Sequence, residues 1–161
     1  KATIEKAKQI INSYEQSGIH KNRILIKIAG TWEGIQAVKA LEAEGISCNC
    51  TLIFSPSQAL LAAKCGATYV SPFMGRIDDW KKDINAGIDL ISDIKTIFTN
   101  YQYNSKILAA SIRSPQHIIE CAKIGVDVAT MPFNALTELI KHPLTDIGLK
   151  KFLDDYRQID G

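Results

Sequence analysis

A lysine lies inside a short apolar run near the start of the chain, where its chemistry would be unusual. Lys27 stands between Ile26 and Ile28 within residues 23–29, and Gly30 ends the run. Such a run, rich in β-branched residues, predicts a strand buried on both faces, as the strands of parallel sheets are. Lysine is rarely fully buried, because an ammonium ion without water or a partner is costly in an apolar environment.

Burial would make the side chain of Lys27 reactive. Loss of hydration lowers the pKa of a lysine, and the neutral amine is a nucleophile that attacks carbonyl groups and forms Schiff bases. Alternatively, Lys27 lies close enough to the strand end to extend its ammonium group into water. The run alone leaves both interpretations open.

Strands alternating with helices surround this lysine. Apolar runs predict strands at residues 23–29, 46–54, 67–71, 106–111 and 126–130. Helical spacing, Ser-Pro starts and glycine stops predict helices at 2–17, 31–45, 55–65, 84–101 and 114–125. A short helix is expected from Pro132 and a terminal helix after Pro143. Residues 72–83, with Trp80, are expected to form a loop and a polar stretch. The alternation predicts one α/β domain over residues 1–161 with a parallel sheet. An open doubly wound fold and the later part of an eight-stranded barrel both fit.

Small and polar side chains recur near the carboxyl ends of these strands. Because residues two apart share a face of a strand, Lys27 falls with Leu25 and Ala29, Asn49 with Thr51, and Ser71 with Tyr69. On the fourth strand, the residues expected on this face are Ile107, Ala109, Ser111 and Arg113. Parallel α/β folds gather their sites at the carboxyl ends of strands. We therefore expect one pocket formed by Lys27, Asn49, Thr51, Ser71, Ser111 and Arg113.

One end of this pocket has the features of a phosphate site. Arg113 follows Ser111 and precedes the helix start at Ser114-Pro115, where free backbone N–H groups favour anions. A guanidinium, a hydroxyl and a helix start together suit a phosphate. Arg76 is a second candidate, although it could instead pair with Asp78 or Asp79.

Composition limits the function classes. The chain has 161 residues, a formal net charge of +2 and 46% hydrophobic residues, without a basic stripe or a membrane-length apolar run. We therefore expect no nucleic-acid or membrane partner and a cytoplasmic location. The four cysteines lack metal-site spacing, so reduced thiols and no metal are expected. The histidines His20, His117 and His142 are each expected to be solvent-exposed.

Four stretches together resemble the transaldolase family: ILIKIAGTWEGIQA, GISCNCTLIF, ATYVSPFMGRIDDW and ILAASIRS. The resemblance covers nearly the whole chain, and the ending HPLTDIGLKKFLDDY is similar to the smaller transaldolases and fructose-6-phosphate aldolases. It implies a (β/α)8 TIM barrel of which this chain supplies about strands 4 to 8, so we expect the chain to be the later part of a longer protein. The terminal helix could pack on its own barrel or on a neighbour's, as in a homo-oligomer.

The resemblance also implies roles for the candidate residues. Lys27 would be the Schiff-base lysine, with Asn49 and Thr51 beside the covalent intermediate and Thr51 holding a catalytic water. Ser71 would contact the dihydroxyacetone unit. The phosphate would bind to Arg76, Ser111 and Arg113. No cofactor is implied, and the partners would be sugar phosphates of the pentose phosphate pathway.

The implied reaction transfers a dihydroxyacetone unit from sedoheptulose 7-phosphate or fructose 6-phosphate to an aldose phosphate. Phe73 stands where the aldolase relatives have a tyrosine whose hydroxyl can position water, and phenylalanine favours transfer over release. The acid and base residues of the family come from the first three strands, which this sequence lacks. The alternatives are therefore a fructose-6-phosphate aldolase and a non-catalytic sugar-phosphate binding fragment.

Overall fold

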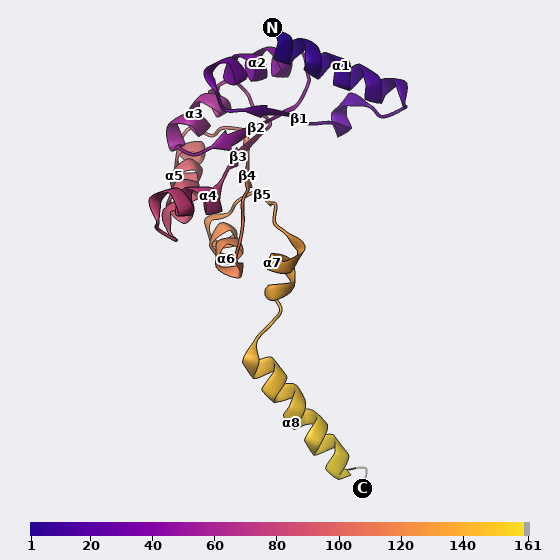
Figure 1. Ribbon diagram of the computed structural model, residues 1–161, viewed down its shortest axis with the longest axis vertical. Helices are drawn as coiled ribbons and strands as arrows, with labels where there is room; N and C mark the ends of the chain where they lie inside the picture. The colour runs from indigo at the N-terminus through magenta and orange to yellow at the C-terminus, as the bar shows by residue number, and fades with distance from the viewer. Residues whose placement is uncertain (160–161) are drawn as a thin grey trace.

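The five strands form one parallel sheet in the order of the chain (Figure 1). The computed structural model describes residues 1–159. The strands are β1 (Ile26–Ala29), β2 (Cys48–Ile53), β3 (Tyr69–Pro72), β4 (Lys106–Ala109) and β5 (Val128–Ala129), and each neighbouring pair is parallel. A doubly wound sheet reverses its strand order partway across. The unbroken order excludes that alternative and fits part of a (β/α)8 barrel.

The helices lie before, between and after the strands, and those between successive strands cover the outer side of the curved sheet (Figure 1). They are α1 (Ala2–Gln16), α2 (Trp32–Ala43), α3 (Pro56–Lys64), α4 (Met74–Lys81), α5 (Ala86–Asn100), α6 (Pro115–Ile124), α7 (Phe133–Glu138) and α8 (Pro143–Ile159), and a 3-10 turn, η1 (Lys21–Arg23), precedes β1. Each element predicted from the sequence is present, with strands shorter than expected. The alternating α/β architecture is confirmed.

Three helix starts follow the predicted capping chemistry. The hydroxyl groups of Thr31, Ser55 and Ser114 accept hydrogen bonds from the N–H groups of Gly34, Gln58 and His117 at 3.1, 3.3 and 3.3 Å. Pro56 and Pro115 occupy the first helical turn of α3 and α6, where the missing N–H costs nothing. These caps orient the segments that leave the carboxyl ends of the strands.

The prediction of a loop and polar stretch at residues 72–83 is wrong, because Met74–Lys81 form helix α4. Met74 and Ile77 lie three residues apart on its buried side. Gly75 weakens the helical signal of the sequence. A Cβ at Gly75 would lie 2.5 Å from the carbonyl oxygen of Ser111, so the close approach of the next loop requires glycine there.

The core lies between the sheet and the helices. Ile26, Ile28, Cys48, Cys50 and Val70 point toward this layer and are buried. All four cysteines are free thiols, as predicted. Burial raises the pKa of Cys48 to about 12, and also raises the pKa of Cys50 and of Cys121 to about 11. These thiols therefore behave as small apolar groups of the core.

Glu42 of α2 ties the amino ends of β2 and β3 together. Its Oε1 accepts hydrogen bonds from the N–H groups of Cys48 (2.8 Å) and Thr68 (2.7 Å) and from the Thr68 hydroxyl (2.9 Å). At the same end of the sheet, Asp127 Oδ2 accepts a bond from the N–H of Ile107 at 2.8 Å. In (β/α) barrels this end contributes stability, whereas the opposite end carries the site.

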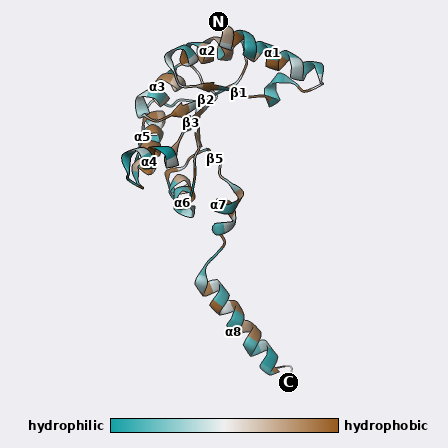
Figure 2. Cartoon of the chain, in the orientation of Figure 1, coloured by the Kyte–Doolittle hydropathy of each residue, from teal (hydrophilic) through white to brown (hydrophobic). Residues whose placement is uncertain are grey.

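Helix α8 extends away from the sheet (Figure 1), and none of its described residues is buried. Both hydrophobic and hydrophilic residues lie along it (Figure 2). Packing of α8 on its own barrel is therefore not found among residues 1–159, and packing on a neighbour stays a prediction. Over the same residues, no helix has both the length and the apolar character needed to cross a membrane.

Candidate active site at the carboxyl ends of the strands

The first three strands place four predicted site residues on the uncovered face of the sheet. Lys27 lies in register with Asn49, and Ala29 with Thr51, across the β1–β2 pair. Asn49 in turn lies in register with Tyr69 of β3, two residues before Ser71. Because residues in register share a face of a parallel sheet, Lys27, Asn49, Thr51 and Ser71 lie on the same side, as predicted.

Lys27 is exposed, so the expectation that its strand is buried on both faces is wrong. Its neighbours Ile26 and Ile28 face the helices, whereas Leu25, on the face of Lys27, is 43% exposed. The reason is that helices cover only one side of β1 among the described residues. Lys27 and Leu25 border a cleft of about 620 Å³ that also involves Ile10 and Tyr14 of α1.

Asn49 and Ser71 form a polar contact beside the lysine strand. The Ser71 hydroxyl donates a hydrogen bond of 2.6 Å to Asn49 Oδ1, and Ser71 is 1% exposed. With its oxygen engaged in this way, Asn49 can present its amide N–H groups to a ligand. The pair therefore offers a donor to an oxygen of a bound molecule in front of β2.

Thr51 carries a buried hydroxyl without a partner among the described residues. The residue is 7% exposed, and its Oγ1 makes no hydrogen bond there. The next residue, Leu52, has a φ of +58°, and the β2–β3 register shifts between Cys50 and Ile53. A buried hydroxyl without a partner is costly, so water or substrate is the expected partner of Thr51.

The loops after β3 and β4 are joined by backbone hydrogen bonds. The N–H groups of Met74 and Gly75 donate to the carbonyl oxygens of Ala110 and Ser111, each at 3.0 Å. Ser111 has a φ of +58°, which is uncommon for a residue with a side chain and indicates a functional or strained turn. The stem of Arg113 then passes Gly75, where a Cβ would lie 2.7 Å from its Nε.

The prediction of the face of β4 is partly wrong. Ile107 and Ala109 were expected beside the site, but they are 1% and 0% exposed and face the helices. The register pairs Tyr69 with Lys106, and the Lys106 ammonium lies 5.8 Å from the centre of the Tyr69 ring. Lys106 and Leu108 therefore share the face of the site. The left-handed conformation of Ser111 breaks the alternation at the strand end, so counting residues two apart fails there.

The two arginines lie at this end of the strands but have different contacts. Arg113 contacts both carboxylate oxygens of Asp79, at 2.8 and 2.7 Å. The guanidinium of Arg76 lies 4.9 Å from the centre of the Phe73 ring, which packs edge-on against Phe54 at 5.8 Å. The alternative pairing of Arg76 with Asp78 or Asp79 is absent from the ion pairs of the described residues. Both arginines are exposed, and Arg113 is the one with an ion-pair partner.

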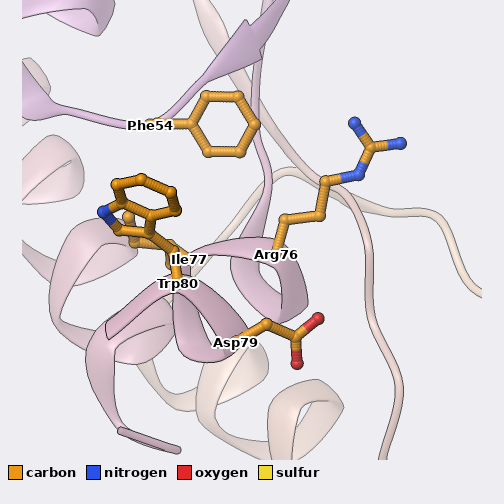
Figure 3. Close-up of a pocket in the computed structure, with 5 residues that line it drawn as sticks. All are labelled: Phe54, Arg76, Ile77, Asp79 and Trp80. Carbon is orange, nitrogen blue, oxygen red and sulfur yellow. The ribbon is translucent and has the colours of Figure 1, made fainter. Parts of the chain in front are cut away.

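A cleft of about 680 Å³ lies next to Arg76 (Figure 3). Its lining residues are Phe54, Arg76, Ile77, Asp79 and Trp80. Phe54 directly follows β2, and Arg76 belongs to the helix that follows β3. The cleft therefore lies beside the carboxyl ends of these strands, where the phosphate site was predicted. Lys27 lies on β1, two strands away from β3, whose carboxyl end leads into the helix that carries Arg76.

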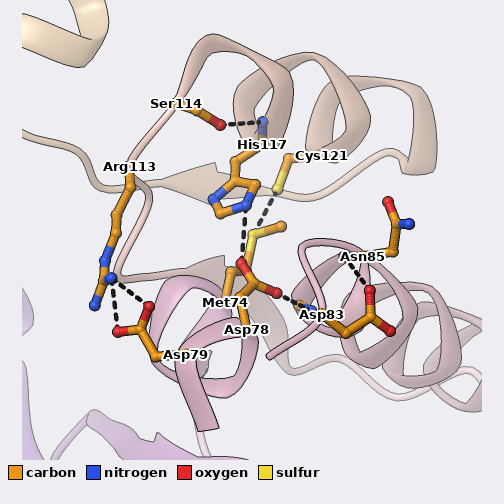
Figure 4. A network of polar contacts seen from close by, with 10 residues as sticks. Met74, Asp78, Asp79, Asp83, Asn85, Arg113, Ser114, His117 and Cys121 are labelled. Carbon is orange, nitrogen blue, oxygen red and sulfur yellow. Dashed lines mark hydrogen bonds and ion pairs between the residues drawn. The ribbon is translucent and has the colours of Figure 1, made fainter. Parts of the chain in front are cut away.

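His117 is the main residue that the sequence did not identify. It was expected in solvent, but it is 7% exposed and its Nε2 lies 3.0 Å from Asp78 Oδ2 (Figure 4). His20 and His142 are exposed, as predicted. One signal was present: His117 and Cys121 stand four residues apart on α6, and both are buried. That spacing indicates a helix face turned toward the core.

The arrangement defines a class of protein: a (β/α) barrel with a strand-borne lysine, an amide and hydroxyl groups at the carboxyl ends of its strands, and arginines beside them. The family described as Transaldolase/Fructose-6-phosphate aldolase matches residues 1–160. The chain belongs to this family.

Curated relatives agree with this assignment. A "Probable transaldolase" of Hydrogenobaculum sp. (strain Y04AAS1) is 56% identical over 138 residues, which are 86% of this chain and 62% of the relative. A protein with the same name from Geobacter sulfurreducens is 52% identical over 98% of this chain and 72% of its own length. Another from Aquifex aeolicus is 55% identical over 84% of this chain and 61% of its own length. The chain thus spans about three fifths to seven tenths of the relatives it matches.

Proposed function

We propose that the protein is a transaldolase that moves a dihydroxyacetone unit between sugar phosphates through a Schiff base on Lys27. One observation carries the proposal: Lys27 lies in register with Asn49 on the face that also holds Thr51 and Ser71. A strand lysine supplies the nucleophile for carbonyl addition, and an amide and hydroxyl groups on the same face can bind oxygen atoms of the substrate. Membership of the family and the relatives named probable transaldolases support it.

The reaction begins with the deprotonated amine of Lys27 attacking the C2 carbonyl of a ketose phosphate, sedoheptulose 7-phosphate or fructose 6-phosphate. Loss of water from the carbinolamine gives an iminium ion, which withdraws electrons from the C3–C4 bond. When this bond breaks and the C4 hydroxyl loses its proton, an aldose phosphate leaves and an enamine remains on Lys27. The enamine then adds to the aldehyde carbon of an acceptor aldose phosphate, and water releases the new ketose.

The neighbouring side chains have distinct roles in this scheme. The unpartnered hydroxyl of Thr51 holds the water that is lost and regained at the carbinolamine. The hydrogen-bonded pair of Asn49 and Ser71 binds hydroxyl groups of the three-carbon unit. The Phe73 ring covers the intermediate without supplying a hydroxyl that would direct water to it.

The phosphate binds at Arg76, Ser111 and Arg113. Arginine suits this role because its N–H groups match the oxygen atoms of a phosphate in pairs. For Arg113 the phosphate would replace Asp79, its present partner. That exchange costs little, since both side chains are about half exposed and such pairs are weak. Binding the phosphate fixes the distance from the sugar C2 to Lys27.

Fructose-6-phosphate aldolase activity is the second candidate, because the family includes both reactions. The two differ in the need for an acceptor. Fructose 6-phosphate is supplied with and without erythrose 4-phosphate, and release of glyceraldehyde 3-phosphate is followed with a coupled assay. A transaldolase shows sustained release only with the acceptor. Sustained release without it indicates the lyase, and no release in either mixture contradicts both and favours a sugar-phosphate binding fragment.

A further inference from the structure

Asp78 and His117 form a largely buried pair between two helices that lead away from the phosphate end. Asp78 belongs to α4 and His117 to α6, and their side chains are only 12% and 9% exposed. His117 Nε2 lies 3.0 Å from Asp78 Oδ2 (Figure 4). Because a carboxylate only accepts, His117 donates this hydrogen bond through Nε2.

The second oxygen of Asp78 engages a third helix. Asp78 Oδ1 accepts a hydrogen bond of 2.7 Å from the N–H of Gly87, in the first turn of α5. A Cβ at Gly87 would lie 2.7 Å from the Cα of Met74, so α5 packs closely against the start of α4. One carboxylate thus joins α4, α5 and α6.

The groups assigned to the phosphate lie on α4 and in the segment that leads into α6. Arg76 stands two residues before Asp78 on α4. Asp79, which directly follows Asp78, forms an ion pair with Arg113. On the other side, His117 stands in the first turn of α6, and its N–H donates to the cap Ser114, which directly follows Arg113. A shift of α4 against α6 would therefore change the separation of Arg76 from Arg113.

We propose that Asp78 and His117 are a positioning pair that sets α4 against α6 so that Arg76 and Arg113 bind one phosphate together. The proposal rests on the proposed function for the identity of the anion. Neither residue of the pair touches the substrate. Its effect is on the affinity for phosphate, because two guanidinium groups bind one anion only when their spacing matches it.

The interface offers a matched control. The Cys121 thiol of α6 lies 3.3 Å from the Met74 sulfur of α4, in the same buried interface one turn from His117. Cys121→Ala removes packing there without removing the polar link. His117→Leu removes the donor while keeping an apolar side chain, and His117→Gln restores a donor N–H in a similar position.

The experiment measures dissociation constants for inorganic phosphate and for fructose 6-phosphate by calorimetry, together with the midpoint of thermal unfolding. We expect His117→Leu to weaken both affinities by roughly ten- to a hundred-fold, the change that corresponds to the loss of one hydrogen bond to a charged group. His117→Gln should recover most of the affinity. Cys121→Ala should lower the unfolding midpoint and leave both affinities unchanged.

Two results would overturn the positioning role. One is unchanged phosphate affinity in His117→Leu; the other is an affinity that follows the unfolding midpoint through all three variants, which indicates a structural role alone. Failure of the proposed function looks different. In that case borohydride traps no sugar on Lys27 of the unaltered protein, while the phosphate affinities still respond to His117 as described.

Discussion

Glu42 offers the stability prediction whose size follows most directly from the structure. Its Oε1 accepts three hydrogen bonds, from Cys48 N–H, Thr68 N–H and the Thr68 hydroxyl, at 2.7–2.9 Å. In Glu42→Ala these donors at the amino ends of β2 and β3 lose their acceptor. Each is partly buried, and a lost bond of this kind costs about 1 kcal/mol, so the change should destabilise the protein by about 2–3 kcal/mol.

Urea and thermal unfolding measure this loss. For a chain of this size, about 2–3 kcal/mol corresponds to a fall of roughly 4–12 °C in the unfolding midpoint. Glu42→Gln keeps one acceptor oxygen, so it should cost about half as much as Glu42→Ala. The binding of phosphate by the folded variants should be unchanged, because Glu42 lies at the opposite end of the strands from the arginines.

Glu44 supplies the matched control, since it stands two residues further along and pairs with Lys8 on the surface. Both side chains of that pair are nearly half exposed, so Glu44→Ala should cost less than about 1 kcal/mol. If Glu42→Ala and Glu44→Ala destabilise the protein equally, the reasoning that the three hydrogen bonds hold β2 and β3 together is refuted.

Four further changes test other parts of the site and the core. Arg113→Met should weaken phosphate binding about ten-fold or more, whereas Asp79→Asn should tighten it up to about five-fold by freeing Arg113. Calorimetry with inorganic phosphate measures both dissociation constants. Equal effects of the two substitutions would contradict the assignment of Arg113 to the phosphate. Phe73→Tyr should raise the release of dihydroxyacetone relative to transfer, as measured by product analysis with and without acceptor, and an unchanged ratio would argue against a role for Phe73. The pKa of Cys48 is raised from 9.0 to about 12, so the unfolded chain loses that proton first and stability should fall as the pH rises above about 9. Urea midpoints from pH 8 to 10 should therefore fall less in Cys48→Val than in the unaltered protein, and identical slopes would contradict this.

The sequence predicted the alternation of strands and helices well, because its signals are local. The run around Lys27, the Ser-Pro pairs at 55–56 and 114–115, and glycines such as Gly45 each act on their own segment. Helix α4 was missed because it depends on tertiary contacts: Met74 and Ile77 are buried against other elements, and Gly75 is needed for the approach of Ser111.

The site was predicted in part for the same reason. Alternation along short strands correctly placed Lys27, Asn49, Thr51 and Ser71 on one face. It failed for β4, since the left-handed turn at Ser111 changes which residues share the face of the site. The contact of Asp78 with His117 joins segments far apart in the chain, and no local pattern indicates such a pair.

Reduction with borohydride in the presence of fructose 6-phosphate tests whether Lys27 forms a Schiff base with the sugar. Borohydride converts the iminium ion to a stable secondary amine, and peptide mapping by mass spectrometry then locates the added three-carbon unit or sugar. We expect an adduct on the peptide that contains Lys27, its absence in Lys27→Met, and none on the exposed Lys39 of α2. No adduct, or an adduct spread equally over surface lysines, would contradict it.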